Sequence, residues 1–270
     1  MTSATVSLGV AGSLGPGLIA AIARAVEAAG FHALWVNDTP DGDALAALAA
    51  AAVVTEQLVL ATGVVPLDRR GPAEILAALQ RIEAEGERVV VGVGSGGART
   101  GQLALVRDGV ARIRDGSGVG VVVGALGPRM RELAARDADG PLLSWLTPAA
   151  AAEQSREAHE LAPATGVRLY VRAAADSAGR ERMRQEAARY ATYPNYAANF
   201  ARLGFGADAT VLPAPGSDDI ASGLAEYLGA ADEVVLRALP ATDDVGAYEH
   251  FVSRAAAARD AARTFAGPEL

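Results

Sequence analysis

Short runs rich in β-branched residues alternate with longer alanine-rich runs along the chain of 270 residues, and this alternation restricts the fold more than any other feature. Eight of the short runs have the pattern of strands, and each is followed by a run with helical periodicity. Strands that alternate with helices predict parallel strands joined by right-handed crossovers. The strands are expected to begin near residues 6, 33, 58, 89, 118, 141, 167 and 233.

Eight such units are the number that closes a (β/α)8 TIM barrel. An open doubly wound sheet is the structural alternative, but no shift in composition and no linker divides the chain. We therefore predict a single α/β barrel domain over residues 1–270, a length that one barrel commonly fills. The expected helices span 16–30, 43–56, 72–87, about 100–114, 129–138, 149–162, about 178–203, about 218–229 and 245–262.

The composition excludes several classes of protein. The chain has no cysteine, which removes disulfides, zinc–thiolate sites and thiol nucleophiles. Its net charge is -8 and no concentrated basic face is evident, so a nucleic-acid partner is not expected. The N-terminus does not resemble a signal peptide, and no apolar stretch of membrane-spanning length lacks charges. We expect a cytoplasmic protein that does not interact with a membrane.

The chemistry of a barrel lies at the C-terminal ends of its strands. Here these ends are rich in glycine and small polar residues and poor in acid–base side chains. The histidines, His32, His159 and His250, fall elsewhere, which argues against a serine–histidine hydrolase. The aspartates near the strand ends are dispersed and typical of helix caps, so no metal site is predicted.

Two glycine-rich turns follow the fourth and fifth strands: GVGSGG at 92–97 and GALGPR at 124–129. Without a Cβ, the backbone N–H groups of such turns can approach a phosphate, and the following helix adds its positive N-terminal end. Arg129 supplies a charge that can pair with the phosphate directly. The alternative is that the glycines only permit tight turns between strand and helix.

Four segments of the chain resemble the bacterial luciferase-like monooxygenase family: AGFHALWVND (29–38), LATGVVPLDRRGPAEILA (60–77), VVVGVGSGG (89–97) and VVVGALGPRMRELAARDADGPLLSWLTP (121–148). The segment YPNYAANFARLGF (193–205) matches more weakly. Members of that family are (β/α)8 barrels that use FMN or the 5-deazaflavin coenzyme F420. The resemblance implies the same fold and a flavin-type cofactor.

The resemblance also implies where the cofactor would bind. The family holds the flavin ring in the barrel mouth against the end of strand three, where a bulge with a non-proline cis peptide often supports it. That position corresponds to Thr62, Gly63 and Val64. The phosphate-binding loops of the family correspond to Gly94, Ser95, Ala125, Gly127, Pro128 and Arg129.

Other candidate residues lie around the expected mouth. Asp38 matches a polar residue near the reacting face and is the catalytic candidate, although Thr39 stands where many members have a histidine. Trp145 ends strand six and is expected to line the substrate pocket, together with the aromatic residues Tyr193 and Tyr196. Ordinary core packing is the alternative for these aromatic residues.

The predicted function is that of an oxidoreductase that transfers a hydride between bound coenzyme F420, or FMN, and a small organic substrate. With FMN, a monooxygenase reaction that uses oxygen would follow. The alternative is a degenerate, non-catalytic barrel that binds a flavin-like or phosphorylated ligand. The connection between the two glycine-rich turns is shorter than in many family members, which implies an open pocket or one that a second subunit covers in a homodimer.

Overall fold

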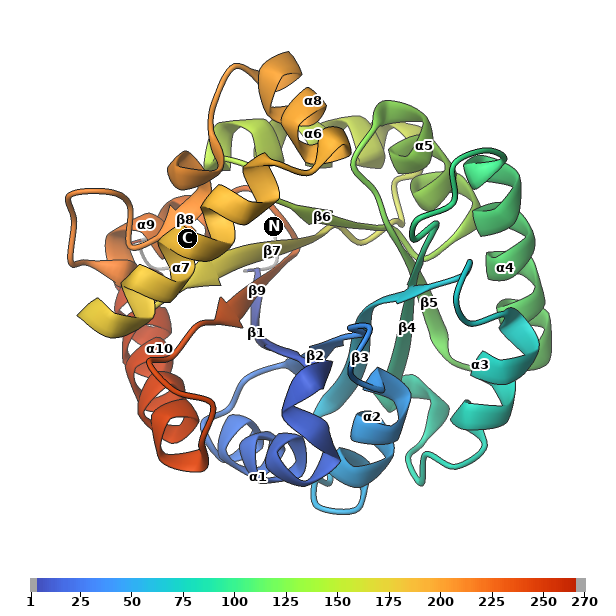
Figure 1. The fold of residues 1–270 in the computed structure, drawn as a ribbon, viewed down its shortest axis with the longest axis horizontal. Coiled ribbons are helices and arrows are strands. Elements are labelled where there is room, and N and C mark those ends of the chain that lie inside the picture. The colour runs from blue at the N-terminus through green and yellow to red at the C-terminus, as the bar shows by residue number, and fades with distance from the viewer. Residues whose placement is uncertain (1–3, 266–270) are drawn as a thin grey trace.

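Eight parallel strands close into a barrel in the computed structural model, which describes residues 4–265 (Figure 1). β1 pairs with β2 on one side and with β9 on the other, and β7 completes the ring by pairing with both β9 and β6. The predicted (β/α)8 TIM barrel is therefore confirmed. The barrel strands are β1 (Thr5–Ala11), β2 (Ala33–Asn37), β3 (Val59–Pro66), β4 (Val89–Gly94), β5 (Gly120–Gly124), β6 (Pro141–Ser144), β7 (Arg168–Ala173) and β9 (Glu233–Ala238).

Helices surround the barrel, and several begin at a residue whose side chain caps them. Asp43, Thr147 and Asp176 each accept a hydrogen bond from a backbone N–H in the first turn of the helix that follows. The helices are α1 (Gly15–Ala28), α2 (Ala44–Ala52), α3 (Pro72–Leu79), α4 (Gln102–Gly116), α5 (Pro128–Asp137), α6 (Pro148–Leu161), α7 (Ser177–Ala191), α8 (Pro194–Leu203), α9 (Ile220–Leu228) and α10 (Val245–Phe265). Within residues 4–265 no helix is long and apolar enough to cross a membrane.

Two helix predictions were wrong in their extent. The region expected to be helical from about 178 to 203 is two helices, because Pro194 has no N–H to continue the first one and instead occupies the first turn of α8. The helix expected over 72–87 ends at Leu79, where tight hydrogen bonds from Arg81 and Ile82 to the third residue back close it. In addition, β8 (Val211–Leu212) pairs with β7 outside the ring.

The barrel interior is filled in layers, because alternate residues of each strand point inward. At the N-terminal end, the Glu233 carboxylate accepts hydrogen bonds from Ser7 Oγ at 2.5 Å and from Trp35 Nε1 at 2.6 Å. Tyr170 packs edge-on against Trp35 in the next layer, with ring centroids 6.2 Å apart. Two residues further along β7 lies Arg172, which therefore reaches the C-terminal mouth.

Candidate active site

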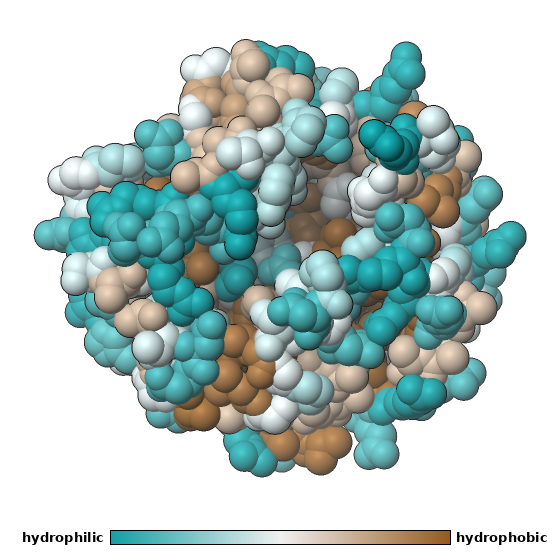
Figure 2. Space-filling view, in the orientation of Figure 1, coloured by the Kyte–Doolittle hydropathy of each residue, from teal (hydrophilic) through white to brown (hydrophobic). Residues whose placement is uncertain are grey.

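A cavity of about 830 Å³ opens at the C-terminal mouth of the barrel. Its floor comes from the ends of β1, β2 and β3, and its walls come from β7, β9, α7 and the beginning of α8. Figure 2 shows the face of the molecule hollowed near its middle, with hydrophilic side chains gathered over α7 beside the hollow. This is the position at which a barrel enzyme is expected to bind its ligands.

The end of β3 forms the floor of the mouth. The peptide bond between Gly63 and Val64 is cis, and the pairing register with β4 shifts between Thr62 and Val65, as the resemblance implies. Asn37 Nδ2 donates a hydrogen bond to the carbonyl of Gly63. A Cβ on Gly63 would lie 2.6 Å from the Tyr170 hydroxyl, so only glycine fits at this position.

Three polar atoms at or beneath this floor have no hydrogen-bond partner among residues 4–265. They are Asn37 Oδ1 and Thr39 Oγ1, in residues that line the mouth, and the hydroxyl of Tyr170, a residue that is only 4% exposed and packs against Gly63. Burial raises the pKa of Tyr170 far above its usual value, so the hydroxyl stays protonated at any physiological pH. The floor therefore offers the amide oxygen of Asn37 and the hydroxyl of Thr39, which the chain itself does not satisfy, and the neutral hydroxyl of Tyr170 lies against Gly63 outside the lining.

Arg172 and Glu186 form a buried ion pair in the wall of the mouth. Arg172 Nε lies 3.0 Å from Glu186 Oε1, and the two side chains are 6% and 11% exposed. The guanidinium also stacks on Trp145, with its carbon 3.9 Å from the ring centroid. Burial raises the pKa of Glu186, but the charges of Arg172 and Arg237 outweigh it and hold that pKa below 4.5. Glu186 is therefore ionised at neutral pH and is not available as a general acid.

Three tyrosines form an aromatic wall around the same cavity. The rings of Tyr193 and Tyr196 lie 5.2 and 4.9 Å from that of Tyr190, and all three line the mouth. Tyr193 and Tyr196 therefore lie where the sequence predicted them. The prediction for Trp145 was wrong, because this residue is 1% exposed and does not line the mouth. It lies behind Arg172 and Tyr190.

A second cavity, of about 600 Å³, lies beside the N-termini of α4 and α5 and is lined on its other side by α8. Four of the predicted phosphate-binding residues line it: Ser95, Gly127, Pro128 and Arg129. We call this cavity the phosphate cleft. No carboxylate belongs to its lining, and Gly127 has nothing within 4 Å of the place where a Cβ would sit. The cleft therefore has open space directly at the beginning of α5.

Helix α8 adds polar groups that the sequence interpretation missed. Asn195, Asn199 and Arg202 all face the phosphate cleft. Asn199 is 5% exposed, its Oδ1 accepts from Arg202, and its Nδ2 has no partner among residues 4–265. Within the same range Arg129 and Arg202 are in no ion pair. Two unpaired guanidinium groups and a buried amide donor suit an anion.

The mouth and the phosphate cleft meet at Val64. The side chain of Val64 faces Gly94 and Gly124, whose Cβ atoms, if present, would lie 3.0 and 3.1 Å from its methyl groups. Val64 lines the mouth, while Gly124 lines the cleft. A ligand with an apolar ring over Val64 could therefore place an anionic group near Arg129.

Three predicted cofactor residues line neither cavity. Thr62 is fully buried, and its hydroxyl donates to the carbonyl of Gly92 and accepts from its N–H, so it joins β3 to β4. Gly94 lies under Val64, and Ala125 is 7% exposed within the core. These residues shape the backbone of the site and do not face a ligand.

Asp38 lines the mouth, but both oxygens of its carboxylate make contacts within the chain. Its side chain is 2% exposed, Oδ1 accepts from the backbone N–H of Ala44 at 3.0 Å, and Oδ2 accepts from Arg69. Both carboxylate oxygens anchor the loop after β2 to the segment after β3. The sequence-based assignment of Asp38 as the catalytic residue therefore finds no support in this geometry.

The sequence contained a signal for the residues that were missed. In β7, Arg168, Tyr170 and Arg172 alternate with apolar residues, as do Glu233 and Arg237 in β9. Period-two alternation in a barrel strand predicts inward-facing side chains, and the last of each series must reach the mouth. In α8, the spacing of Asn195, Asn199 and Arg202 predicts one polar face.

Comparison with known families and structures agrees with this architecture. The family model described as luciferase-like monooxygenase matches residues 3–105. The resemblance to that family is confirmed. The match contains the floor of the mouth and the part of the phosphate cleft formed by Ser95, Gln102 and Leu103, while the cleft residues of α5 and α8 and the mouth arginines Arg172 and Arg237 lie beyond it. No curated protein matches the chain in sequence.

Solved structures of luciferase-like enzymes share the fold over nearly the whole chain at low sequence identity. An F420-dependent secondary alcohol dehydrogenase, solved with an F420–acetone adduct, is 17% identical, with a TM-score of 0.69 over 95% of this chain and 100% of that chain. The coenzyme F420 dependent tetrahydromethanopterin reductase from Methanopyrus kandleri is 15% identical, with a TM-score of 0.65 over 94% and 98%. EDTA monooxygenase from Chelativorans sp. BNC1 is 11% identical, with a TM-score of 0.68 over 95% and 93%.

Proposed function

We propose that this chain is an oxidoreductase that binds a flavin-type cofactor and transfers a hydride between it and a small organic substrate. Coenzyme F420 is the first candidate and FMN the second, because the ATGVVP and GALGP segments resemble the F420-dependent branch of the family. In this proposal the ring lies in the mouth over Gly63 and Val64, and the phosphate that both cofactors carry lies in the phosphate cleft.

The observation that carries the proposal is the pairing of the two cavities across Val64. One cavity has an aromatic wall within a largely polar lining and unsatisfied polar atoms at its floor, and the other, among residues 4–265, has unpaired cations and no carboxylate. A ligand with a planar ring and a phosphate would satisfy both. A plain small metabolite would fill one cavity and leave the buried amide of Asn199 unpaired.

The residues of the chain would bind, orient and shield the cofactor. Val64 supplies an apolar surface for the ring face, and Asn37, which holds the carbonyl of Gly63, offers its free Oδ1 at the ring edge. Arg129 and Asn199 would hold the phosphate at the positive end of α5. A bound deazaflavin or flavin supplies the hydride chemistry itself, so the mouth does not need a histidine or lysine.

A second candidate function is binding without turnover. Its support is the position of Asp38, whose carboxylate is occupied by Arg69 and Ala44, and the absence of any histidine from the lining of the mouth. In that case the barrel would hold a flavin-like or phosphorylated ligand as a storage or regulatory protein. The two candidates share the cofactor site and differ only in turnover.

Fluorescence titration of the purified chain with FMN and with coenzyme F420 tests the proposal. We expect saturable binding of one of them at micromolar concentration, followed by a change in its absorbance when substrates are offered. Binding without any hydride exchange, over a panel of alcohols and aldehydes, would favour the second candidate. If neither cofactor binds at micromolar concentration, both candidates in their flavin form are wrong.

A further inference from the structure

One guanidinium in the mouth, that of Arg237, has no carboxylate within ion-pair distance among residues 4–265, although its charge also lowers the pKa of the nearby Glu186. Four arginines line the cavity: Arg172, Arg182, Arg189 and Arg237. Arg172 is paired with Glu186, and Arg182 makes two hydrogen bonds of 3.0 Å to the carboxylate of Asp243. The remaining two, Arg189 and Arg237, differ from each other in exposure and in pairing.

Arg189 lies on the rim, with 61% of its side chain exposed and one distant contact to Glu186 at 3.9 Å. Arg237 is half-buried at the end of β9, and among residues 4–265 it is in no ion pair. Its Nη1 donates to the carbonyl of Ala238, and the residue lines the cavity beside Tyr248. Arg237 is therefore a cation held in place at the side of the mouth without an ion-pair partner among the described residues.

We propose that the substrate of this site carries a single carboxylate, and that Arg237 binds it. This inference rests on the proposed function, because it takes the mouth as the place where substrate meets the cofactor. A guanidinium presents parallel N–H donors that match the two oxygens of a carboxylate. A ligand with an anionic group can pair with such a half-buried cation. It should therefore bind more tightly than a neutral ligand of the same shape.

The neighbouring groups select a monoanion over a phosphate. Four carboxylates line the cavity: Asp38, Asp41, Glu186 and Asp243. Glu186 contacts Arg172 and Arg189, and Asp243 contacts Arg182. A dianion at Arg237 would meet more repulsion from these carboxylates than a monoanion, which adds one negative charge against the one guanidinium without an ion pair. The phosphate cleft, in contrast, has no acidic residue in its lining. The two cavities are therefore suited to different anions.

The aromatic wall beside the charged groups indicates the body of the substrate. Tyr190, Tyr193 and Tyr196 present aromatic surface to the mouth, and Leu14 and Leu239 add apolar surface. An apolar or aromatic group would pack there while its carboxylate reaches Arg237. The expected substrate is a small organic acid with an aromatic or aliphatic body.

Phenylacetate and phenylacetamide form a matched pair of probes, since they differ in charge and hardly in shape. We expect calorimetry to show that the chain binds phenylacetate at least about tenfold more tightly than phenylacetamide, as the loss of a charge-assisted hydrogen bond predicts. Arg237→Gln should remove that preference, and Arg237→Lys, which keeps the charge, should retain part of it. Melting temperatures of both variants check that they fold.

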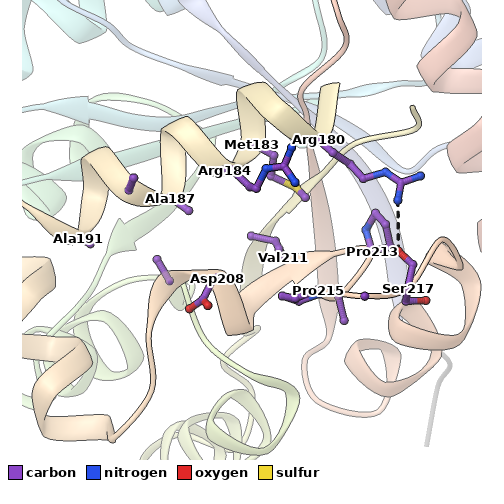
Figure 3. A pocket seen from close by; sticks show the side chains of 14 residues that line it. Arg180, Met183, Arg184, Ala187, Ala191, Asp208, Val211, Pro213, Pro215 and Ser217 are labelled. Atoms are coloured by element: carbon purple, nitrogen blue, oxygen red, sulfur yellow. Dashed lines mark hydrogen bonds between the residues drawn. The ribbon is translucent and has the colours of Figure 1, made fainter. Parts of the chain in front are cut away.

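Arg184→Gln is the charge control. Unlike Arg237, which is in β9, Arg184 is an exposed residue of α7 that pairs with Glu181, and it lines a different cavity, of about 480 Å³, between that helix and the segment 207–217 (Figure 3). Arg184→Gln removes the same charge as Arg237→Gln. It should leave the preference for phenylacetate within about twofold, because Arg184 does not line the mouth and solvent screens its interaction with a ligand bound there. If Arg184→Gln reduces the preference for phenylacetate as much as Arg237→Gln does, the net charge of the chain, and not Arg237, causes the preference.

The outcomes separate this inference from the proposed function. If phenylacetate and phenylacetamide bind equally, or if Arg237→Gln keeps the preference, the inference is wrong even where FMN or coenzyme F420 binds. If Arg237→Gln weakens cofactor binding and leaves phenylacetate binding unchanged, Arg237 is a cofactor contact and the inference is also wrong. If neither cofactor binds but the preference depends on Arg237, the carboxylate site stands and the proposed function fails.

Discussion

Replacing Gly127 with valine tests the phosphate cleft with little disturbance to the fold. Gly127 precedes α5 with φ of -91° and ψ of 159°, an extended conformation that a β-branched residue adopts readily. Nothing lies within 4 Å of the added Cβ, so the side chain would enter open space in the cleft. Valine is a poorer residue than glycine at a helix N-cap, which costs about 1 kcal/mol. For a chain of this size we expect the melting temperature to fall by about 2–4 °C.

The effect on the cofactor should be much larger. The added isopropyl group occupies the space through which a phosphate approaches the beginning of α5. Hydrogen bonds to a charged group contribute about 1.5–3 kcal/mol each, so the loss of one weakens binding roughly 10- to 150-fold. Fluorescence titration with FMN and with coenzyme F420 measures this change, and a thermal melt measures the small loss of stability.

The control is Gly118→Val, at the opposite end of β5. Gly118 is exposed, and an added Cβ there also meets nothing within 4 Å. This variant should bind the cofactor as the unaltered chain does. If Gly127→Val also binds with unchanged affinity, the phosphate does not lie at the N-terminus of α5, and the assignment of the cleft is refuted.

Three further predictions concern carboxylates that accept hydrogen bonds within the chain. Asp38→Asn should lower the free energy of unfolding by about 1–3 kcal/mol, as measured in urea, while cofactor affinity stays within about twofold, because Asp38 holds Arg69 and not a ligand. Glu233→Ala should cost about 3–5 kcal/mol because it leaves buried donors unpaired, whereas Glu226→Ala at an exposed position should change stability by less than about 0.5 kcal/mol. Burial raises the pKa of Glu27, but three backbone N–H donors outweigh this effect and hold that pKa below 4.5. The contribution of Glu27 to stability is therefore complete above pH 4.5 and is lost as the pH falls through the lowered pKa. The stability difference between the unaltered chain and Glu27→Gln should shrink over that range of pH.

Periodicity was sufficient to predict the fold. The alternation of strand and helix predicted eight strands, and the structure places each beginning within about two residues of the expected position, as with β5 at Gly120. The break at Pro194 was missed because helical spacing continues on both sides of it. Periodicity predicts which residues share a helix face, but it does not show whether one helix or two carry them. A proline inside a helical pattern is the signal that should have divided it.

The site was predictable only in its backbone. Glycines such as Gly127 act because they have no side chain, which leaves open space beside the backbone. A glycine is visible in the local sequence without knowledge of the tertiary structure. The role of Asp38, in contrast, depends on Arg69, which lies 31 residues further along the chain. Likewise, Arg172 and Arg237 both end an alternating series in a barrel strand, but only Arg172 forms an ion pair, with Glu186, among residues 4–265. Pairings of this kind are formed by the tertiary structure and cannot be read from one strand.

Helix α8 complicates any experiment on the two cavities, because it contributes to both. Tyr193 and Tyr196 face the mouth, while Asn195 and Asn199 face the phosphate cleft. A substitution in α8 that weakens phosphate binding can shift the tyrosines, and one that alters the aromatic wall can shift the amides, since a short helix moves as one body. A loss of affinity in an α8 variant therefore does not identify which cavity the ligand contacts. Gly127 lies outside α8 and adds volume to the cleft alone, so its variant assigns the phosphate without disturbing the wall of the mouth.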